Sequence, residues 1–431
     1  MPLPPVRRDR RWPVPAALTL ALALALAVPA SPISDPTGAA LPDGVRLRVP
    51  PLHLLLAPLF DLWDAVSMLG TRRLAAFFLA TLGYYVVWRV HRVWRDRRRA
   101  RKGAPPGRRR GVRSLPAPLR EAVLAVAALA GLLAFVLLGA LWHRPMVALA
   151  GVPDDLMVVD VHAHTNASHD VRNSLMRKFD AEALRRWHRR AGFDATFVTD
   201  HNTVAGLAGV RSVGETWLCP GIEVSAWRAH ILLLGDTRPV DRGPYSRSLD
   251  GLLALLRDSE ARYGAISVAS IPEYERNHWT NLDRFVAAGV DGFEIVNASP
   301  KANELGRARR DSVIALARAH DLLVLGASDS HGWGATSMVW NLVRVPGWRT
   351  SGVGACARLV AALRDGGFET VQVVERHRLR ADTRWPLWLT PIGAVWETWR
   401  GLDPARAASW LVWIWGLGLI LRRPSRAGGA A

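Results

Sequence analysis

The sequence predicts an α/β fold, a β/α barrel flanked by transmembrane helices, from three observations. From Met157 onward, short β-branched runs alternate with segments of helical periodicity. Such alternation indicates a parallel sheet, and six or seven repeats of it favour a barrel. Histidines and carboxylates stand at the ends of several of the runs, where a barrel gathers its chemistry. Long apolar segments lie near both termini.

The alternating pattern predicts the strands and helices of the central region. Gly192 follows one helical segment directly and is expected to end it, because glycine readily takes the left-handed conformation at a helix C-terminus. The expected strands are 157–161, 195–199, 221–224, 230–234, 265–268, 292–296 and 322–325, and the expected helices are 181–187, 249–262 and 303–320.

The apolar segments near the termini predict a membrane anchor. Segments 12–30, 74–90 and 122–142 are long enough to span a bilayer, and 409–421 is slightly short. The first also ends in Val28-Pro29-Ala30, which is typical of a cleaved signal peptide. Segment 31–50 is expected to be loop. Segments 51–70 and 385–399 carry Asp61, Asp64 and Glu397, so packed or interfacial helices are expected there.

The formal charge of +19 comes almost entirely from arginine. A dense arginine cluster at 92–113 lies between two apolar segments, as the positive-inside rule requires of a cytoplasmic loop. With the basic N-terminus and Arg422-Arg423 on the same side, residues 145–405 are expected outside the cytoplasm. No basic module interleaved with aromatic residues is evident, so no nucleic-acid partner is expected. Cys219 and Cys356 have no C-x-x-C spacing and are expected to be small buried residues, with a single disulfide as the alternative.

Potential metal ligands follow the strands in order. His162 and His164 alternate at the end of the first strand, so they point to the same side of it. Each further residue alone has an ordinary structural explanation, such as a helix cap or a turn, but together they predict a metal cluster. Imidazoles mixed with carboxylates suit Zn²⁺, Mn²⁺ or Fe²⁺ better than Mg²⁺ alone. The further residues are Asp200, His201, Glu223, His230, Glu294, Asp329 and His331.

These motifs resemble those of the polymerase-and-histidinol-phosphatase (PHP) family of metal-dependent phosphoesterases. The resemblance covers roughly residues 155–375 and implies a distorted seven-stranded, TIM-like β/α barrel that holds two or three divalent metals. The matching stretches are Asp160-Val161-His162-Ala163-His164-Thr165, Ser168-His169-Asp170, Val198-Thr199-Asp200-His201-Asn202-Thr203, Gly221-Ile222-Glu223-Val224-Ser225, His230-Ile231-Leu232-Leu233-Leu234-Gly235, Asp291-Gly292-Phe293-Glu294-Ile295 and Gly326-Ala327-Ser328-Asp329-Ser330-His331.

The resemblance also implies a ligand set. One metal takes His162, His164, Glu223 and Asp329; a second shares Glu223 and adds His230; a third takes His201, His331 and Asp170, with His169 as the alternative to Asp170. Glu223, Asp329 and Asp200 are the candidate catalytic carboxylates, and Asp160 is expected to orient a ligand imidazole.

The chain departs from the family at one motif. The family carries His-Pro after the strand that corresponds to 265–269, and this chain has Ser270-Ile271-Pro272 there. His278 is the candidate replacement if its loop folds back. Without a replacement, the second metal loses an imidazole ligand.

The expected function is hydrolysis of a phosphate ester by a metal-activated water. Arg172, Arg228 and Arg276 are candidates to bind the phosphate, and the expected partner is a phosphorylated small molecule or a lipid headgroup. A non-catalytic metal-binding sensor or scaffold is the alternative. A transporter is disfavoured because the spans hold few charges and no inverted repeat. The expected organisation is a membrane anchor over 1–150, a PHP-like metallohydrolase domain over 151–380, and an interfacial helix with a C-terminal membrane segment over 381–431.

Overall fold

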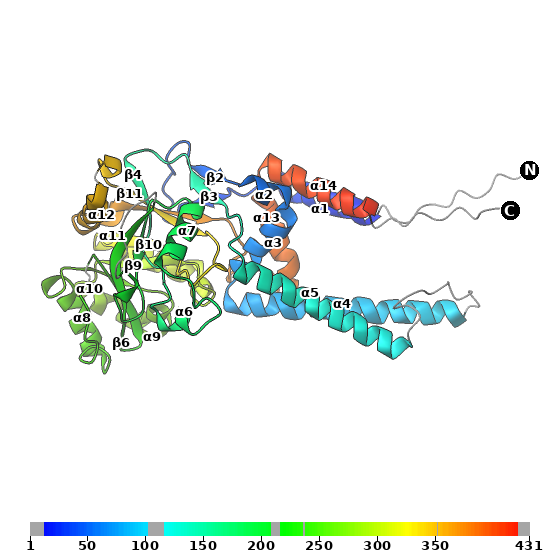
Figure 1. Cartoon of the computed structure of the whole chain (residues 1–431), viewed down its shortest axis with the longest axis horizontal. Coiled ribbons are helices and arrows are strands. Elements are labelled where there is room, and N and C mark those ends of the chain that lie inside the picture. Colours follow the sequence, from blue (N-terminus) through cyan, green and yellow to red (C-terminus); the bar gives the residue numbers. More distant parts are fainter. Residues whose placement is uncertain (1–12, 102–115, 208–215, 236–237, 351, 421–431) are drawn as a thin grey trace, which may run out of the picture.

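The computed structural model describes residues 13–101, 116–207, 216–235, 238–350 and 352–420 (Figure 1). It consists of a mixed α/β domain built on one curled sheet, from which long helices project in a common direction. The α/β class predicted from the alternating pattern is therefore correct.

The central sheet has ten strands among the described residues, where seven were expected. Strands β4 to β10 are neighbours in chain order, and β11, β12 and β1 extend the sheet beyond β4. The order across the sheet is β1 (Ile33–Ser34), β12 (Val371–Arg376), β11 (Val339–Arg344), β4 (Leu156–Asp160), β5 (Ala195–Val198), β6 (Trp217–Ala226), β7 (Ala229–Leu234), β8 (Ile266–Ala269), β9 (Gly292–Asn297) and β10 (Leu323–Ala327).

The sheet is mixed, which corrects the expectation of a parallel sheet. β4, β5 and β6 run parallel, as do β8, β9 and β10, but β7 is antiparallel to both of its neighbours. Only Trp227 and Arg228 separate β6 from β7. Two residues allow a hairpin but cannot make the crossover that a parallel pair needs. Arg228 accordingly takes a left-handed conformation, with φ of 52°.

The two ends of the β4 to β10 series are joined by side-chain and loop contacts. Asn341 of β11 accepts a hydrogen bond from the Gly326 amide and donates to the carbonyl oxygens of Gly326 and Val159. Beyond the strand ends, the Asp329 amide donates to the His162 carbonyl oxygen at 2.9 Å. These contacts curl the sheet and bring the end of β10 beside the end of β4.

Helices of the α/β domain pack on the sheet and follow the expected pattern closely. α7 begins where the Asp180 side chain accepts from the Ala183 amide at 2.8 Å, and it ends at Gly192, whose φ is 85°. Its buried Leu184 and Trp187 pack under the sheet. The helices are α6 (His169–Arg172), α7 (Ala181–Ala191), α8 (Leu249–Ala261), α9 (Glu273–Asn277), α10 (Leu282–Ala287), α11 (Arg307–Ala319) and α12 (Ala355–Arg364).

The remaining helices form the part that projects from the sheet domain (Figure 1). Two of them contain segments, Thr71–Arg95 and Pro118–Leu141, that are long and apolar enough to cross a membrane by length and composition. The helix over Pro13–Ala27 is apolar but shorter. These helices are α1 (Pro13–Ala27), α2 (Pro51–Leu55), α3 (Ala57–Ser67), α4 (Thr71–Arg101), α5 (Ala117–Leu141), α13 (Thr390–Arg400) and α14 (Pro404–Ile420).

Two expectations for the N-terminal region are wrong. The arginine segment 92–113 is not all loop, because α4 continues as helix to Arg101; residues 102–115 lie outside the described part. Segment 31–50 is not all loop either. It contributes β1 to the main sheet and β2 (Arg46–Arg48), which pairs with β3 (Ala148–Ala150). Both strands depend on partners far along the chain, so local composition could not reveal them.

Helix α3 is packed rather than spanning, as its acidic residues predicted. Asp64 is buried and lies 3.2 Å from the Arg144 guanidinium, 2.9 Å from that of Arg376 and 2.6 Å from the Thr336 hydroxyl. A buried carboxylate needs such partners to offset the loss of water. These contacts attach α3 to β12 and to the loop that follows β10.

Cys219 and Cys356 form a disulfide that joins β6 to α12. The sequence predicted two small buried cysteines, with a single disulfide as the alternative, and the structure has the disulfide. No free cysteine is present.

Candidate metal centre

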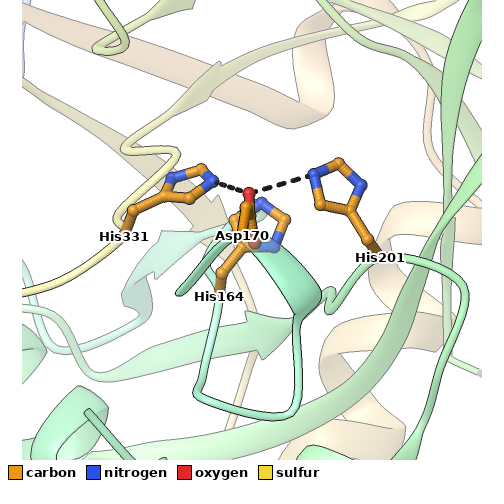
Figure 2. Close-up of side chains that lie close together, drawn as sticks. All are labelled: His164, Asp170, His201 and His331. Atoms are coloured by element: carbon orange, nitrogen blue, oxygen red, sulfur yellow. Dashed lines mark hydrogen bonds and ion pairs between the residues drawn. The ribbon is translucent and has the colours of Figure 1, made fainter. Parts of the chain in front are cut away.

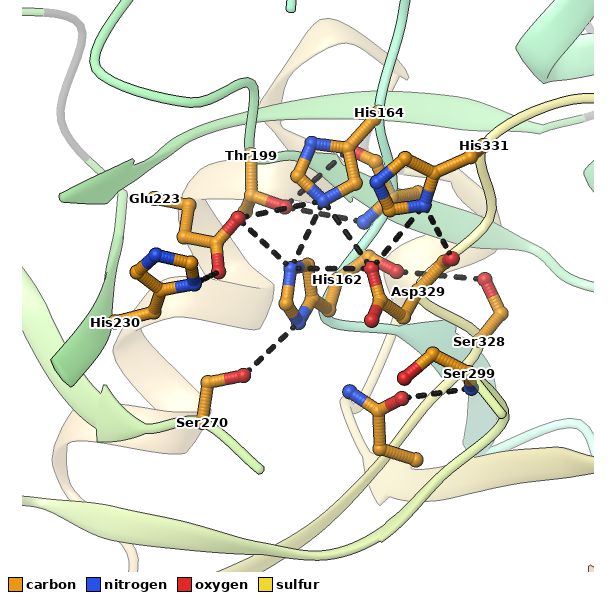
Figure 3. A network of polar contacts seen from close by, with 12 residues as sticks. His162, His164, Thr199, Glu223, His230, Ser270, Ser299, Ser328, Asp329 and His331 are labelled. Carbon is orange, nitrogen blue, oxygen red and sulfur yellow. Dashed lines mark hydrogen bonds and ion pairs between the residues drawn. The ribbon is translucent and has the colours of Figure 1, made fainter. Parts of the chain in front are cut away.

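The centre is built first on the end of β4. His162 and His164 follow that strand at alternate positions, and their Nε2 atoms lie 3.0 Å apart. Asp329, which follows β10, places Oδ1 3.6 Å from Nε2 of His162 and 3.3 Å from Nε2 of His164. Figure 3 shows His162 between Glu223 and Asp329. All these side chains except Asp329 are almost fully buried.

Glu223 of β6 is the central carboxylate. Its Oε2 atom lies 3.3 Å and 3.4 Å from Nε2 of His162 and of His164. The same oxygen is 2.9 Å from Nδ1 of His201, and Oε1 is 2.9 Å from Nδ1 of His230. Each oxygen therefore faces a different group of imidazoles, which is what a carboxylate that bridges two cations requires.

Asp170 lies between two further imidazoles (Figure 2). Its Oδ2 atom is 2.6 Å from Nε2 of His331 and 3.2 Å from Nε2 of His201. Of the two candidates that the sequence left open at this position, the structure places Asp170 in the cluster. His169 is exposed and lines the mouth of the site instead.

The donor atoms fit divalent cations. Oε2 of Glu223 is buried and lies within 3.4 Å of ring nitrogens of three histidines, His162, His164 and His201. None of these ion-pair contacts of Oε2 has hydrogen-bond geometry. Buried polar atoms are almost always hydrogen-bonded, so a carboxylate oxygen that lies among three ring nitrogens without hydrogen-bond geometry indicates donors arranged about an ion. Three groups among the described residues have ligand atoms within 4.8 Å of one another: His162, His164 and Glu223; His201, Glu223 and His230; and His164, Asp170, His201 and His331.

Burial and neighbouring charges lower the pKa of one histidine of the cluster and raise the pKa values of others. Burial, with the charge of His331, lowers the pKa of His164 to about 4, which leaves a neutral imidazole suited to a metal. Burial also acts to lower the pKa of His201 and of His331, but the neighbouring carboxylates prevail and raise these values to about 10 and about 9. The pKa values of Glu223 and Asp329 lie well below their ordinary range, because the surrounding imidazoles outweigh the effect of burial.

Asp200, which was predicted as a catalytic residue and not as a metal ligand, does not belong to any of the three groups. Its two carboxylate oxygens accept hydrogen bonds from the amide and the hydroxyl of Thr165, both at 2.6 Å. Thr165 follows His164 directly, so Asp200 holds the loop that presents this ligand. A strand-end carboxylate can serve the backbone beside a site as well as the site itself, and the catalytic part of Asp200 stays a prediction.

The carboxylate that orients a ligand imidazole is Glu294 of β9 and not Asp160. Oε1 of Glu294 lies 2.7 Å from Nδ1 of His162, and Glu294 is fully buried. Asp160 instead contacts the buried imidazole of His188, at 2.7 Å, and the amide of Ser328. Glu294 was visible within a matching motif, but nothing in the sequence connects it with His162.

Ser270, in place of the expected histidine, does not reach the cluster as a ligand. Its hydroxyl donates to Oε2 of Glu294 at 3.0 Å and lies 3.5 Å from Nδ1 of His162. His278 does not replace the missing imidazole, because it is buried against the Trp227 carbonyl oxygen, 3.1 Å from its Nε2. The nearest substitute is Glu273, which was not predicted. Its Oε2 atom is buried without a hydrogen-bond partner, 3.8 Å from Nδ1 of His230.

A cavity of about 420 Å³ opens at the mouth of the site. Its lining side chains supply imidazoles, a guanidinium, an amide and a hydroxyl, and no carboxylate, which suits an anion. Arg242 provides the guanidinium. The three arginines expected to bind phosphate, Arg172, Arg228 and Arg276, are exposed and do not line this cavity. The lining residues are His169, His201, Asn202, Ser225, His230 and Arg242.

Comparison with known proteins shows only distant likenesses. No family model and no curated protein matches the chain. A Bifidobacterium adolescentis structure described as a metal-dependent phosphoesterase is 19% identical, over 41% of this chain and 88% of that one, with a TM-score of 0.31. PsfC from Pseudomonas syringae is 17% identical, over 56% and 95%, with a TM-score of 0.34. A lesion-specific endonuclease from Pyrococcus furiosus is 13% identical, over 51% and 57%, with a TM-score of 0.36. Likenesses this distant carry no argument about chemistry, which depends on the residues described above.

Proposed function

We propose that this chain is a metal-dependent phosphoesterase that hydrolyses a phosphate ester with water. The observation that carries the proposal is the convergence of five imidazoles and two carboxylates into three overlapping groups at one end of the sheet, with the carboxylate of Asp329 3.3 Å from His164. Oxygen and nitrogen donors in this mixture suit Zn²⁺, Mn²⁺ or Fe²⁺. Such ions, when bound, lower the pKa of water and neutralise charge on the phosphoryl oxygens.

The residues of the chain have separate parts in this proposal. His162, His164 and Asp329 would hold one cation, Glu223 would bridge to the position beside His230, and Asp170, His201 and His331 would hold a third. Glu294 keeps the imidazole of His162 turned toward the cluster by accepting from Nδ1. This fixes the tautomer in which Nε2 is free to bind metal.

Arg242 and the imidazole of His169 lie at the mouth of the site. We assign them to binding the phosphate, because a guanidinium pairs well with phosphoryl oxygens. The absence of a carboxylate among the described lining residues of this cavity supports an anionic substrate over a neutral amide or ester.

We further propose that α4 and α5 anchor the chain in a membrane, with the metal centre outside the cytoplasm. The ends of α4 and α5 that face each other in the sequence lie away from the sheet domain (Figure 1), and the arginine-rich segment 92–113 begins within α4. The positive-inside rule puts that segment in the cytoplasm. The disulfide between Cys219 and Cys356 supports this orientation, because disulfides persist outside the reducing cytoplasm.

Hydrolysis of p-nitrophenyl phosphate by the full chain in detergent, with Mn²⁺ or Zn²⁺ added, tests the enzymatic proposal. We expect turnover that chelation abolishes. His164→Ala removes a ligand shared by two groups, and we expect it to lower kcat/KM by about 100-fold or more.

His320→Ala is the matched control, because His320 directly follows α11, is exposed and belongs to none of the metal groups. It should keep the wild-type rate. Bound metal with no turnover on any phosphoester would instead favour the sensor or scaffold alternative.

A further inference from the structure

An apolar cavity of about 570 Å³ lies between the metal cluster and the projecting helices. It shares no lining residue with the polar cavity at the mouth of the site, and it is lined by other residues of the metal cluster. Asp329 and His331 line one end of it. The other end is lined by apolar side chains of the two long helices, namely Leu74 and Phe78 of α4 and Val136 and Ala140 of α5.

The helical end of this cavity lies within the two segments that could cross a membrane. Phe78 lies seven residues after the start of α4 at Thr71, and Val136 lies five residues before the end of α5 at Leu141. At 1.5 Å per residue, these side chains lie about 10 Å and about 8 Å inside the helices. The cavity therefore extends from two of the candidate metal ligands to side chains within the two apolar segments.

A second observation marks this side of the sheet domain as the side that meets lipid. Leu175, in the loop after α6, lines the same cavity and is 73% exposed. Among the described residues from 143 to 386, it is the only large hydrophobic side chain that is exposed. An isolated leucine beside an apolar cavity and two apolar helices is well placed to enter the bilayer surface.

We propose that this cavity holds the hydrocarbon chain of a membrane lipid whose phosphate ester reaches the metal cluster. This inference rests on the proposed function and narrows its substrate to lipid phosphates. Transfer of a hydrocarbon chain from water to such an apolar lining is favourable in free energy. At the part of the cavity formed by α4 and α5, the polar part of a sugar phosphate or nucleotide would lie against Leu74, Phe78 and Val136, whose side chains offer no hydrogen bonds, and this costs binding free energy.

A series of alkyl phosphates of four to ten carbons tests the inference. With the full chain in nanodiscs, kcat/KM should rise by up to about fourfold for each added methylene, the factor that corresponds to burying one methylene. Val136→Trp fills the cavity from α5, and we expect it to flatten this dependence on chain length.

Leu138→Trp is the matched control. Leu138 lies two residues away on the other face of α5, is 64% exposed and does not line the cavity. It adds the same indole at nearly the same depth, so any effect of partition into the bilayer is equal in the two variants. We expect Leu138→Trp to keep the wild-type series. Equal series in wild type and Val136→Trp would overturn the inference.

The two proposals can fail separately. If p-nitrophenyl phosphate is hydrolysed but the rates for the alkyl phosphates do not depend on chain length, the proposed phosphoesterase activity stands and the proposed lipid substrate is contradicted. If no phosphoester is hydrolysed, labelling decides the inference: an alkyl phosphonate with a diazirine in its chain should label peptides that contain Phe78 or Val136. Absence of that labelling, or equal labelling in Val136→Trp, would contradict a hydrocarbon-binding cavity.

Discussion

Oε1 of Glu294 lies 2.7 Å from Nδ1 of His162, on the side of the imidazole that faces away from the metal cluster. Both residues are buried, and the other oxygen of Glu294 accepts from Ser270, the Ile271 amide and Asn297. This network fixes the carboxylate, and the carboxylate in turn fixes the ligand imidazole. Glu294 is therefore a positioning residue.

We expect Glu294→Gln to lower metal affinity by about 10- to 100-fold, the usual cost of losing a partner that orients a ligand. The amide keeps the shape of the side chain but loses the charge that makes His162 a better donor. Titration with Zn²⁺ against a chelating indicator measures the effect. Glu275→Gln is the control, since Glu275 pairs with Arg309 away from the cluster. Equal affinity in the two variants would contradict the part assigned to Glu294.

Glu273 is expected to replace the histidine that is missing at position 270. Its Oε2 has no hydrogen-bond partner among the described residues and lies 3.8 Å from Nδ1 of His230, close enough for both to reach one cation. Glu273→Gln should therefore lower the bound metal by one ion per chain, as measured by elemental analysis of the purified protein. Glu275→Gln, on the same short helix α9, should keep the full content. An unchanged metal content in Glu273→Gln would show that the position beside His230 does not depend on Glu273.

Metal binding should release protons at neutral pH. The carboxylates raise the pKa of His201 to about 10 and that of His331 to about 9, so without cations both imidazoles are protonated at pH 7.5. A cation must displace these protons, and affinity should fall as the pH falls. Calorimetry in buffers of different ionisation enthalpy should give a release of more than one proton per chain.

The same pKa shifts predict the stability of metal-free protein. Folding raises the pKa of both histidines above its value in the unfolded chain, near 6.5. Each histidine therefore stabilises the folded state fully at a pH below 6.5, and this stabilisation is lost as the pH rises through about 9 to 10. Chelated protein should therefore have a lower Tm at pH 10 than at pH 7. His201→Gln should have a smaller difference between these two Tm values, and an unchanged difference would contradict the coupling.

Single cysteines should report the side of the membrane. The native cysteines are paired, so an introduced cysteine is the only free thiol. We expect a membrane-impermeant maleimide to label Asp250→Cys, on the sheet domain, in intact cells. Arg97→Cys, near the far end of α4, should be labelled only after the cells are opened. The reverse pattern would place the metal centre in the cytoplasm.

The disulfide should contribute measurably to stability. It closes a sequence separation of 137 residues between Cys219 and Cys356. Loss of a crosslink of this kind typically costs about 2 to 5 kcal/mol. The double variant Cys219→Ala/Cys356→Ala should unfold at a correspondingly lower temperature. Reducing agent should lower the Tm of the wild-type chain by a similar amount and leave the double variant unchanged; no shift in either case would show that the bond is not formed.

Local pattern was enough to predict much of the sheet domain. Strand runs near 157, 195, 230 and 292 and the end of α7 at Gly192 depend on alternation, helical periodicity and glycine conformation, which neighbouring residues express. The residue types of the candidate metal centre could be read in the same way, since histidines and carboxylates followed the strands. How these side chains divide among cations was only an inference from resemblance.

Tertiary structure decided what depends on distant partners. β1 exists because residues near 33 pair with β12, and β7 runs antiparallel because of a two-residue hairpin. Glu294 became the partner of His162, and Asp200 that of Thr165, through contacts across 132 and 35 residues. A sequence shows which groups can bind a metal or a backbone amide, but only the folded chain determines which of them meet. The reason is that the energy of a contact between two side chains depends on their distance in space, and this distance cannot be read from their positions in the sequence.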